Sequence, residues 1–416
     1  MSKKRKNSNY AYNPNGKVSD EPKNRFFKIF VSAFLSLVLV LGAVLALIVA
    51  FANKGAVVEY EGISINEESA NYICSYYKYR YMSSLSSAGV SVADSEEFWN
   101  TAAEGEKTYG DLLRENAGEY LKQLLCAVYL YDTYATFSSK DKERVNKACD
   151  EVLTYKADGS EKVFNSLSEK FGFDYDAFKE ANVLIYKSNM AKEIIYGTNG
   201  ENMKNFPDVC NHYLNSQYSH VHLIFIRTEN TFVIDENGNR VVGEDGFDEV
   251  RPLTDEEKAK RQEAISYLDK MILNKENDAD IQISPELFAN YQSKYDEGDS
   301  TKYADGYYFG KNSDYAKEFS AAYRQVVEAA LNMSVGDYKK VSTDVGVCYI
   351  YKDFIESGAY ATANSDFFTD FYKDGANFVF SESLVTLSQN AKTTERFDKI
   401  DFALLPYNSD LVAYYE

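Results

Sequence analysis

Histidine is scarce in this sequence and closely paired cysteines are absent, and both facts narrow the chemistry open to it. Three histidines occur in 416 residues, and no two of the five cysteines stand at C-x-x-C spacing. This excludes the usual zinc signatures and a disulfide-dense scaffold. The G-x-S-x-G, P-loop, H-E-x-x-H and dinucleotide-binding fingerprints are also missing. We therefore expect no metal ion and no cofactor.

Charge is spread unevenly along the chain. Residues 1–28 carry eight Lys or Arg against Asp20 and Glu21, a net charge of +6, while the whole chain carries −19, which leaves −25 for the rest. A nucleic-acid-binding body would be basic, so we expect no nucleic-acid partner. The first 28 residues are polar with little periodicity and are interpreted as a basic cytoplasmic tail.

One long apolar run follows this tail. Residues 29–52 contain no charged side chain, and such a helix is long enough to cross a hydrocarbon core of about 30 Å. The basic flank places the N-terminus in the cytoplasm and the bulk of the chain outside it. We predict a single-pass anchor in the cell membrane. A cleavable signal peptide is the alternative, because Ala50-Phe51-Ala52 matches a cleavage site, although the run exceeds the roughly 7–15 residues of a signal core.

The remainder divides by its apolar period. Residues 53–215 are predicted to be a helical domain, because apolar side chains in segments such as 108–137 recur at helical spacing. Ser64 and Glu67 match an S-x-x-E capping box and predict a helix start there. Residues 357–416 are predicted to be a C-terminal helical segment.

From Tyr218 the period changes to two, and residues 218–226 (YSHVHLIFI) predict a strand that opens with His220 and His222. Asn237-Gly238 is a hairpin turn signal. The order strand, helices, strand, helix, strands over residues 216–356 predicts a four-stranded α+β module, so the fold class is α+β.

This pattern resembles the SurA/PrsA group of extracytoplasmic foldases, which carry a parvulin-type (PpiC) peptidyl-prolyl isomerase domain. VHLIFI is similar to the opening strand S-H-I-L, with His222 at the histidine, and ADGYYF resembles the G-G-x-x-x-F turn. ALNMSVGD resembles A-L-x-x-G-E, and STDVGVCYIYK resembles T-x-x-G-x-H-I-I, with Thr343 and Gly346 matching. The resemblance covers roughly residues 57–380 and implies that the C-terminal segment packs back on a SurA-N-like chaperone domain.

The resemblance also implies site residues. His222 and Thr343 would belong to a hydrogen-bonded catalytic set, and Cys348 stands where the family has its second histidine. The acidic member is Asp296, Glu297 or Asp299, and the sequence leaves this choice open. The proline pocket would be lined by Phe319, by Tyr315, and by Tyr307 or Tyr308.

Rotation about an X–Pro bond has a barrier of roughly 18–20 kcal/mol. Lowering it needs an apolar slot, removal of water and donors that stabilise the twisted amide. Cys348 is a weaker donor than histidine, so the resemblance implies weak or lost isomerase activity. The alternative is that these residues are only the core of a retained fold.

His220 and His222 lie on the same side of the predicted strand, which suits two metal ligands. No further His or Cys motif supplies a third ligand, so we expect His222 to face the site and His220 to be a solvated strand-edge residue.

Three functions remain open. The leading one is a membrane-tethered folding factor that binds unfolded or newly exported polypeptides. A fully active isomerase and a non-catalytic assembly scaffold are the alternatives. The tyrosine-rich stretch YICSYYKYRY is a candidate client-binding surface, and the oligomeric state is not indicated.

Overall fold

The computed structural model describes residues 55–244, 246, 248–273, 284–298, 302–311 and 321–415. The predicted basic tail and anchor, together with Asp299, Tyr315 and Phe319, lie outside the described residues. Among the helices that are described, none combines the length and the apolar character needed to span a bilayer.

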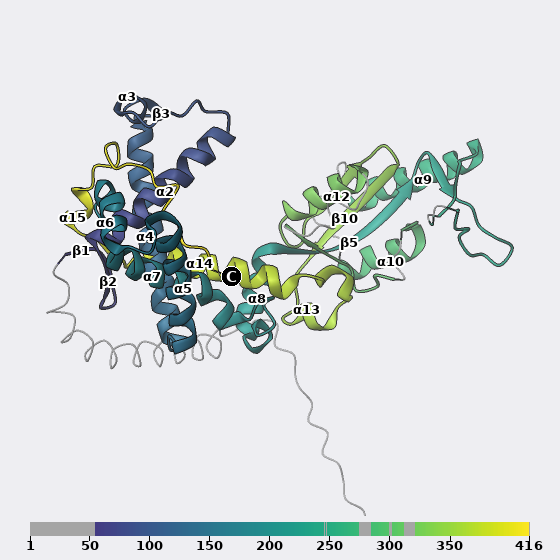
Figure 1. The fold of residues 1–416 in the computed structure, drawn as a ribbon. Coiled ribbons are helices and arrows are strands. Elements are labelled where there is room, and N and C mark those ends of the chain that lie inside the picture. Colours follow the sequence, from purple (N-terminus) through teal and green to yellow (C-terminus); the bar gives the residue numbers. More distant parts are fainter. Residues whose placement is uncertain are drawn as a thin grey trace, which may run out of the picture. The chain divides into compact units, whose positions relative to one another are not determined.

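The chain forms two compact units (Figure 1). The first contains residues up to Asn189 and residues from Thr386 onward, and the second contains residues 190–385. These divisions fall inside two helices and differ from the predicted boundaries at 215/216 and 356/357. The predicted functional domains stay predictions.

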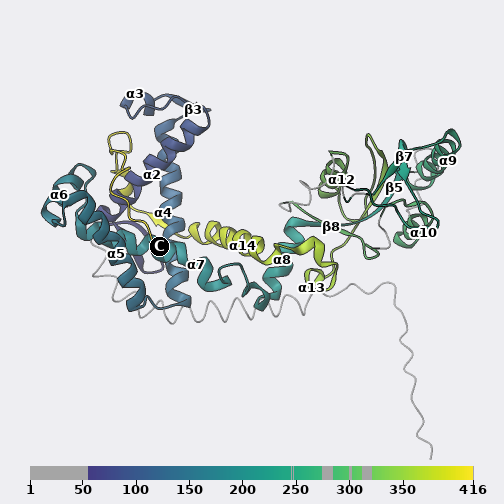
Figure 2. The same cartoon turned by 45° about the vertical axis from the view of Figure 1, so that its right-hand side comes forward.

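The first unit is mainly helical (Figure 2). Its elements are β1 (Ala56–Tyr60), β2 (Ile63–Asn66), α2 (Glu67–Ser87), α3 (Glu96–Trp99), β3 (Ala102–Glu104), β4 (Lys107–Thr108), α4 (Tyr109–Tyr134), α5 (Ser139–Ala157), α6 (Glu161–Ser168), η1 (Glu169–Phe171), most of α7 (Tyr175–Tyr196), the end of α14 (Phe371–Ser388), β11 (Lys392–Thr393) and α15 (Glu395–Asp398). The helix predicted over 108–137 is confirmed as α4, which ends three residues earlier, at Tyr134.

The predicted capping box at Ser64 is wrong. Ser64 lies in β2, opposite Glu59 of β1, so its backbone belongs to the strand pair. The helix begins only where this strand ends, and the side chain of Asn66 caps it by accepting a hydrogen bond from the Ser69 N–H (2.8 Å).

The C-terminal residues join the first strand of this unit. Thr393 of β11 pairs with Val58 of β1 in a three-stranded antiparallel sheet of order β11-β1-β2. A buried lysine makes a second link, because Lys78 on α2 donates hydrogen bonds to the carbonyl oxygens of Ala403 (3.2 Å) and Leu405 (2.7 Å). Segments from the two ends of the described chain therefore share one core.

The second unit is built around a four-stranded antiparallel sheet of order β8-β5-β10-β9. The predicted order of strand, helices, strand, helix, strands is confirmed, and so is the α+β class. The elements are η2 (Met203–Asn205), α8 (Pro207–Gln217), β5 (Tyr218–Arg227), β6 (Asn230–Phe232), β7 (Val250–Pro252), α9 (Asp255–Ile272), α10 (Pro285–Tyr295), β8 (Tyr307–Gly310), α12 (Ala321–Leu331), β9 (Tyr338–Ser342), β10 (Gly346–Asp353), α13 (Ala359–Thr362) and η3 (Ser365–Phe368).

Both faces of this sheet are buried, as the helices on either side in Figure 1 indicate. Ile224 and Tyr349 pack in a core with α9 and α10, which we call the α9/α10 face. Leu223, Cys348 and Ile350 pack in a second core with α12, which we call the α12 face. Neighbouring residues of β5 and β10 therefore point to different cores.

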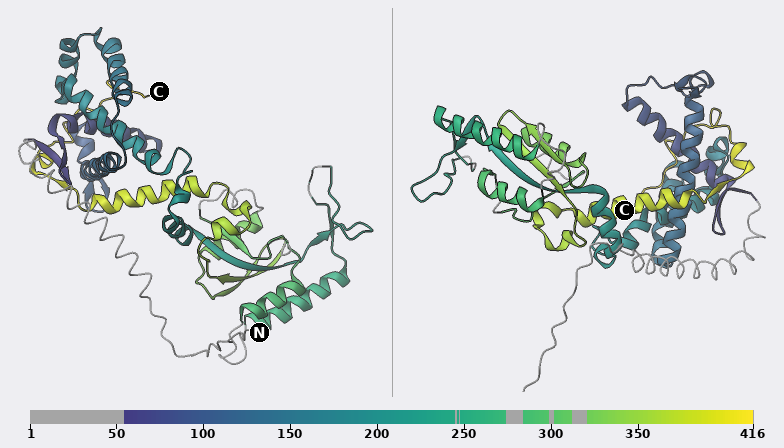
Figure 3. Two further views of the ribbon diagram at one scale, coloured as in Figure 1. Left: turned by 90° about the horizontal axis from the view of Figure 1, so that it is seen from below. Right: turned by 180° about the vertical axis from the view of Figure 1, so that it is seen from behind.

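A hairpin arm extends the sheet unit between β5 and α9 (Figure 3). β6 pairs with β7, and the bridge between Ile234 and Arg240 closes its tip around Gly238, whose φ is +83°. The turn predicted from Asn237-Gly238 is confirmed.

Candidate functional site

His222 lies on the α9/α10 face of the sheet. Its strand partner on β10 is Tyr351, and the two rings are nearly parallel, with centroids 6.1 Å apart. Tyr351 belongs to the core formed with α9 and α10. The ring of His222 therefore points toward this side and not toward α12.

Cys348 lies on the opposite face. It pairs with Phe225 of β5, three residues beyond His222, and it packs in the core of α12. An odd separation along a strand changes the face, because successive side chains alternate. The structure does not bring His222 and Cys348 together, which corrects the expectation that they share one hydrogen-bonded set.

Thr343 lies in the turn between β9 and β10. Its hydroxyl group is 2.9 Å from the carbonyl oxygen of Gly346 and accepts from the Gly346 N–H (3.2 Å). Gly346 pairs with Arg227, five residues from His222 along β5. Since a strand rises ~3.3 Å per residue, five residues span about 16 Å. Thr343 shapes the turn and does not reach His222.

The three acidic alternatives separate clearly. A carboxylate oxygen of Asp296 accepts from the main-chain N–H of Phe225 (2.7 Å), directly opposite Cys348 in the sheet. The carboxylate of Glu297 pairs with Arg261 (2.7 Å) and accepts from the Arg227 N–H. Asp299 lies outside the described residues. Asp296 is therefore the described carboxylate whose charge reaches Cys348.

The two candidate pocket tyrosines differ in their partners on β5. Tyr307 pairs with Val221, whose side chain is in the α12 core. Tyr308 pairs with His220 and stacks on its ring, with centroids 4.4 Å apart and an interplanar angle of 5°. Both tyrosines belong to the core cluster that contains Cys348, and Tyr308 reaches His220 from there. Tyr315 and Phe319 lie outside the described residues.

A polar set on the α12 face consists of Cys348, Asp296, Tyr307 and Tyr323. Burial, followed by the charge of Asp296, raises the pKa of the Cys348 thiol. Burial also raises the pKa of Tyr323 well above its ordinary value, with Tyr307 and Cys348 adding to the shift. The Cys348 thiol and the Tyr323 phenol therefore stay neutral near pH 7, so they can donate hydrogen bonds but supply no positive charge. Tyr323 was not predicted as a site residue, because the YxxVV spacing of its helix does not distinguish it from an ordinary core residue.

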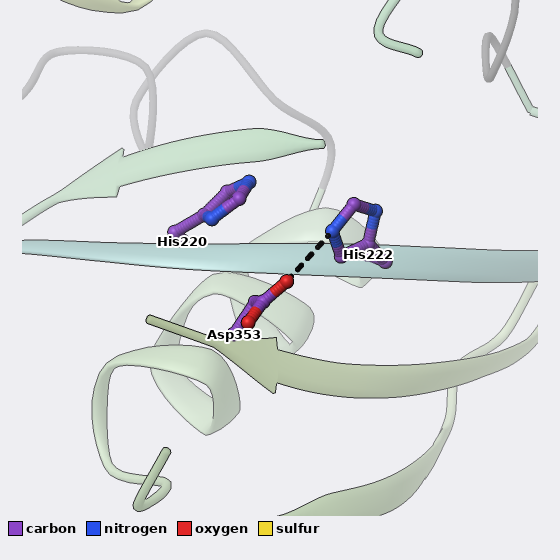
Figure 4. Close-up of side chains that lie close together, drawn as sticks. All are labelled: His220, His222 and Asp353. Carbon is purple, nitrogen blue, oxygen red and sulfur yellow. Dashed lines mark ion pairs between the residues drawn. The ribbon is translucent and has the colours of Figure 1, made fainter. Parts of the chain in front are cut away.

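A second polar set lies on the α9/α10 face and consists of His220, His222 and Asp353 (Figure 4). The ring centroids of the two histidines are 5.1 Å apart, so the prediction that they share a side is confirmed. Nε2 of His222 is 3.4 Å from a carboxylate oxygen of Asp353. Burial first, and then the charge of His220, lower the pKa of His222, while Asp353 opposes the shift.

His220 is not the solvated edge residue that the sequence suggested. It is 7% exposed, and both ring nitrogens face main-chain carbonyl oxygens. Nδ1 is 2.8 Å from the oxygen of Phe354, and Nε2 is 2.6 Å from the oxygen of Asp305. The expectation is wrong because β5 is an inner strand of the sheet, between β8 and β10.

This set does not fit a metal ion well. Asp353 supplies the third ligand type that the sequence reasoning did not find, and the ligand atoms of all three residues lie within 4.8 Å of one another. A metal-bound imidazole must turn a lone pair toward the ion. Each nitrogen of His220 faces a carbonyl oxygen instead, which leaves two ligands, His222 and Asp353.

Asp353 was missed because its role depends on register. It pairs with His220 across the two strands, although 133 residues separate them in the chain. No local motif marks it. The DGYYF stretch did hold a usable signal, because Gly306 has φ +87° and a Cβ there would lie 2.6 Å from Nε2 of His220.

Comparisons with known proteins find similar solved structures but no matching family model or curated protein. Among solved structures, PrsA from Bacillus subtilis aligns with 74% of this chain and 93% of its own, at 15% identity and a TM-score of 0.19. The peptidylprolyl isomerase PrsA from Bacillus cereus aligns with 73% and 96%, at 18% identity and a TM-score of 0.21. The foldase protein PrsA from Streptococcus pneumoniae aligns with 70% and 92%, at 12% identity and a TM-score of 0.18. Superpositions with these scores are too loose to carry an argument about function.

Proposed function

We propose that this protein is a membrane-anchored, extracytoplasmic folding factor that binds unfolded or newly exported polypeptides. Its second unit is proposed to be a parvulin-like module whose peptidyl-prolyl isomerase activity is weak or lost. The resemblance of residues 218–353 to the parvulin pattern supports the module, and so does the four-stranded sheet in the predicted element order. The anchor at residues 29–52 rests on the uncharged run alone.

The observation that carries the weak or lost activity is the placement of the two β5 histidines. Tyr351, the strand partner of His222, packs in the α9/α10 core, whereas Cys348 packs in the α12 core, and the ring of His220 lies beside that of His222. The resemblance puts the proline slot on the Cys348 side, where the described polar groups are a neutral thiol, two tyrosines and Asp296. A twisted amide needs well-placed donors in a dry site. This set supplies weak donors next to a carboxylate, so we expect little catalysis.

A tyrosine surface on the first unit is the proposed place of polypeptide binding. Tyr77 on α2 stacks on Tyr120 of α4 with centroids 5.0 Å apart, and Tyr79 stacks on Tyr407 at 6.3 Å. Tyr120 and Tyr407 are 38% and 43% exposed. Tyrosine offers a large apolar area with a polar tip, so such a surface can contact varied extended segments.

Suppression of aggregation tests this proposal. The full chain, reconstituted in vesicles, should reduce light scattering by an unfolded model client at stoichiometric ratios. A double variant, Tyr77→Ser with Tyr79→Ser, should lose most of this effect. Tyr155→Ser is the matched control, because Tyr155 is 83% exposed on α5 and takes no part in the stacks.

Two other results would overturn the proposal. Equal suppression by the double variant and the control would remove the tyrosine surface from client binding. No suppression by any form, with one dedicated membrane protein retained on the full chain, would favour the assembly scaffold instead.

A further inference from the structure

His220 makes two contacts that a neutral imidazole cannot make together. The oxygen of Phe354 lies 2.8 Å from Nδ1, and the oxygen of Asp305 lies 2.6 Å from Nε2. Both partners are carbonyl oxygens, which only accept hydrogen bonds. A neutral ring carries hydrogen on one nitrogen, and its other nitrogen presents a lone pair. Both contacts are favourable only when the ring is doubly protonated.

The contacts join segments on both sides of β5. Asp305 precedes β8, in a turn closed by the hydrogen bond from the Gly306 N–H to the Tyr303 oxygen (2.9 Å). Phe354 follows β10 and begins the connector that leads to α13. His220 itself pairs with Tyr308 of β8 and with Asp353 of β10. One ring therefore fastens the ends of three adjacent strands.

The turn is shaped to accept this ring. At Gly306 a Cβ would lie 2.6 Å from Nε2 of His220 and 2.8 Å from the oxygen of Val221. Real Cβ atoms do not approach so closely, so only glycine lets the Asp305 oxygen reach the ring. The stacked ring of Tyr308 at 4.4 Å covers one face of the imidazole, and an aromatic face attracts a cation.

Three carboxylates lie near the stacked rings of His220 and Tyr308. The titratable groups facing it are His222 on β5, Tyr308 on β8, Asp305 in the preceding turn, Asp353 on β10 and Glu356 in the connector. Asp305, Asp353 and Glu356 all act on Tyr308, on which the ring lies. Protonation of the neighbouring His222 is disfavoured, because burial and the charge of His220 lower the pKa of His222.

We propose that His220 is a buried imidazolium that clamps the Asp305–Gly306 turn and the connector after β10 to strand β5. Release of its proton leaves one carbonyl facing a lone pair at less than 3 Å, so that contact opens. The connector and the turn then loosen as pH rises. This makes the exit of the chain from the sheet sensitive to pH, whether or not the module binds proline.

The protonation state of His220 is directly measurable, because the chain has three histidines. The full chain, labelled with ¹⁵N at histidine and reconstituted in vesicles, would be studied by solid-state NMR about one pH unit above the ordinary histidine pKa of ~6.5. We expect one ring with hydrogen on both nitrogens. Its signals should vanish in His220→Gln and persist in His212→Gln, the control at an exposed histidine bound to Glu382. Three neutral rings, or a doubly protonated ring that survives His220→Gln, would overturn the proposal.

A second measurement needs no variant. Hydrogen–deuterium exchange of residues 303–309 and 354–359 would be followed against pH in the wild-type chain and normalised to exchange of an unstructured peptide. Protection should fall in both segments over the pH range where the NMR signals of His220 become those of a neutral ring, while β10 stays protected. Protection that is independent of pH in both segments would contradict the clamp.

Discussion

Lys78 offers the sharpest prediction about stability. Its side chain is fully buried, and its ammonium group lies 2.6 Å from a carboxylate oxygen of Asp94, which also accepts from the indole N–H of Trp99 (2.8 Å). The ammonium group donates to the oxygens of Ala403 and Leu405 as well, and lies 4.8 Å from the centre of the Trp99 ring. One side chain thus holds α2, the loop after it and the C-terminal segment together.

Lys78→Met keeps the apolar stem but removes the charge and three donated hydrogens. Breaking a buried ion pair on one side typically costs ~3–5 kcal/mol. Asp94 is 21% exposed and retains the indole N–H, which moves the expected cost to the lower end. Burial lowers the pKa of Lys78, which shows that burying the charge is itself unfavourable. The methionine variant does not bury this charge, so it regains part of the lost stability. We expect a loss of about 3 kcal/mol in the free energy of unfolding.

Urea unfolding followed by tryptophan fluorescence measures this loss, because Trp99 is the single tryptophan and is buried beside Lys78. The signal reports the first unit alone, which is appropriate for a chain of two units. With a slope of roughly 2–3 kcal/mol per molar urea, the midpoint should fall by about 1 M. Lys107→Met removes an exposed ion pair with Glu115 and is the matched control, with no expected change. Equal midpoints for the two variants would refute the reasoning.

Three further predictions concern the sheet unit. Gly306→Ala should destabilise this unit by about 2–4 kcal/mol, because it adds a clash with His220 to a left-handed backbone. Gly238→Ala, at the open tip of the hairpin arm, should cost about 1 kcal/mol. Calorimetry of both variants measures the difference, and equal losses would contradict the clash. Burial, with help from nearby carboxylates, raises the pKa of Tyr308 to about 12, while an unfolded tyrosine ionises near pH 10. The folded state keeps a proton that the unfolded state loses, so this contribution to stability should be intact below about pH 10 and be lost as pH rises toward 12. Titration of the Tyr308 phenol near pH 10 in the folded protein would contradict it. All five cysteines are buried, so an alkylating reagent should label Cys348 only after urea is added. Mass spectrometry that finds alkylated Cys348 in the native chain would contradict this prediction.

Local signals predicted the elements well where one signal had no competitor. Asn237-Gly238 predicted a hairpin turn, and the structure confirms it with the bridge between Ile234 and Arg240. At the start of α2 the S-x-x-E motif predicted Ser64 as the cap, whereas the structure has Asn66 there. Ser64 pairs with Glu59 in the adjacent strand, and a capping motif contains no information about such pairing.

The site was harder to predict because β5 is buried on both sides. In a strand with one solvent-exposed face, the alternation of polar and apolar residues shows which side chains point into the core. Here Leu223 and Ile224 are both buried, in different cores, so the sequence placed His220 and His222 together but did not identify their face. The contacts of His220 with Asp305 and Phe354 depend on two main-chain oxygens, and no side-chain motif encodes those.

The central claim is that this is a polypeptide-binding protein whose parvulin-like module is a poor catalyst. Its most direct test is proline-limited refolding of a model client, with the full chain in vesicles, an uncatalysed control, and the variants His222→Ala and His212→Ala. The account predicts refolding rates equal to the uncatalysed rate for all forms, together with suppressed client aggregation. Acceleration by the wild-type chain that His222→Ala abolishes and His212→Ala preserves would contradict it, because a histidine on the α9/α10 face would then be catalytic.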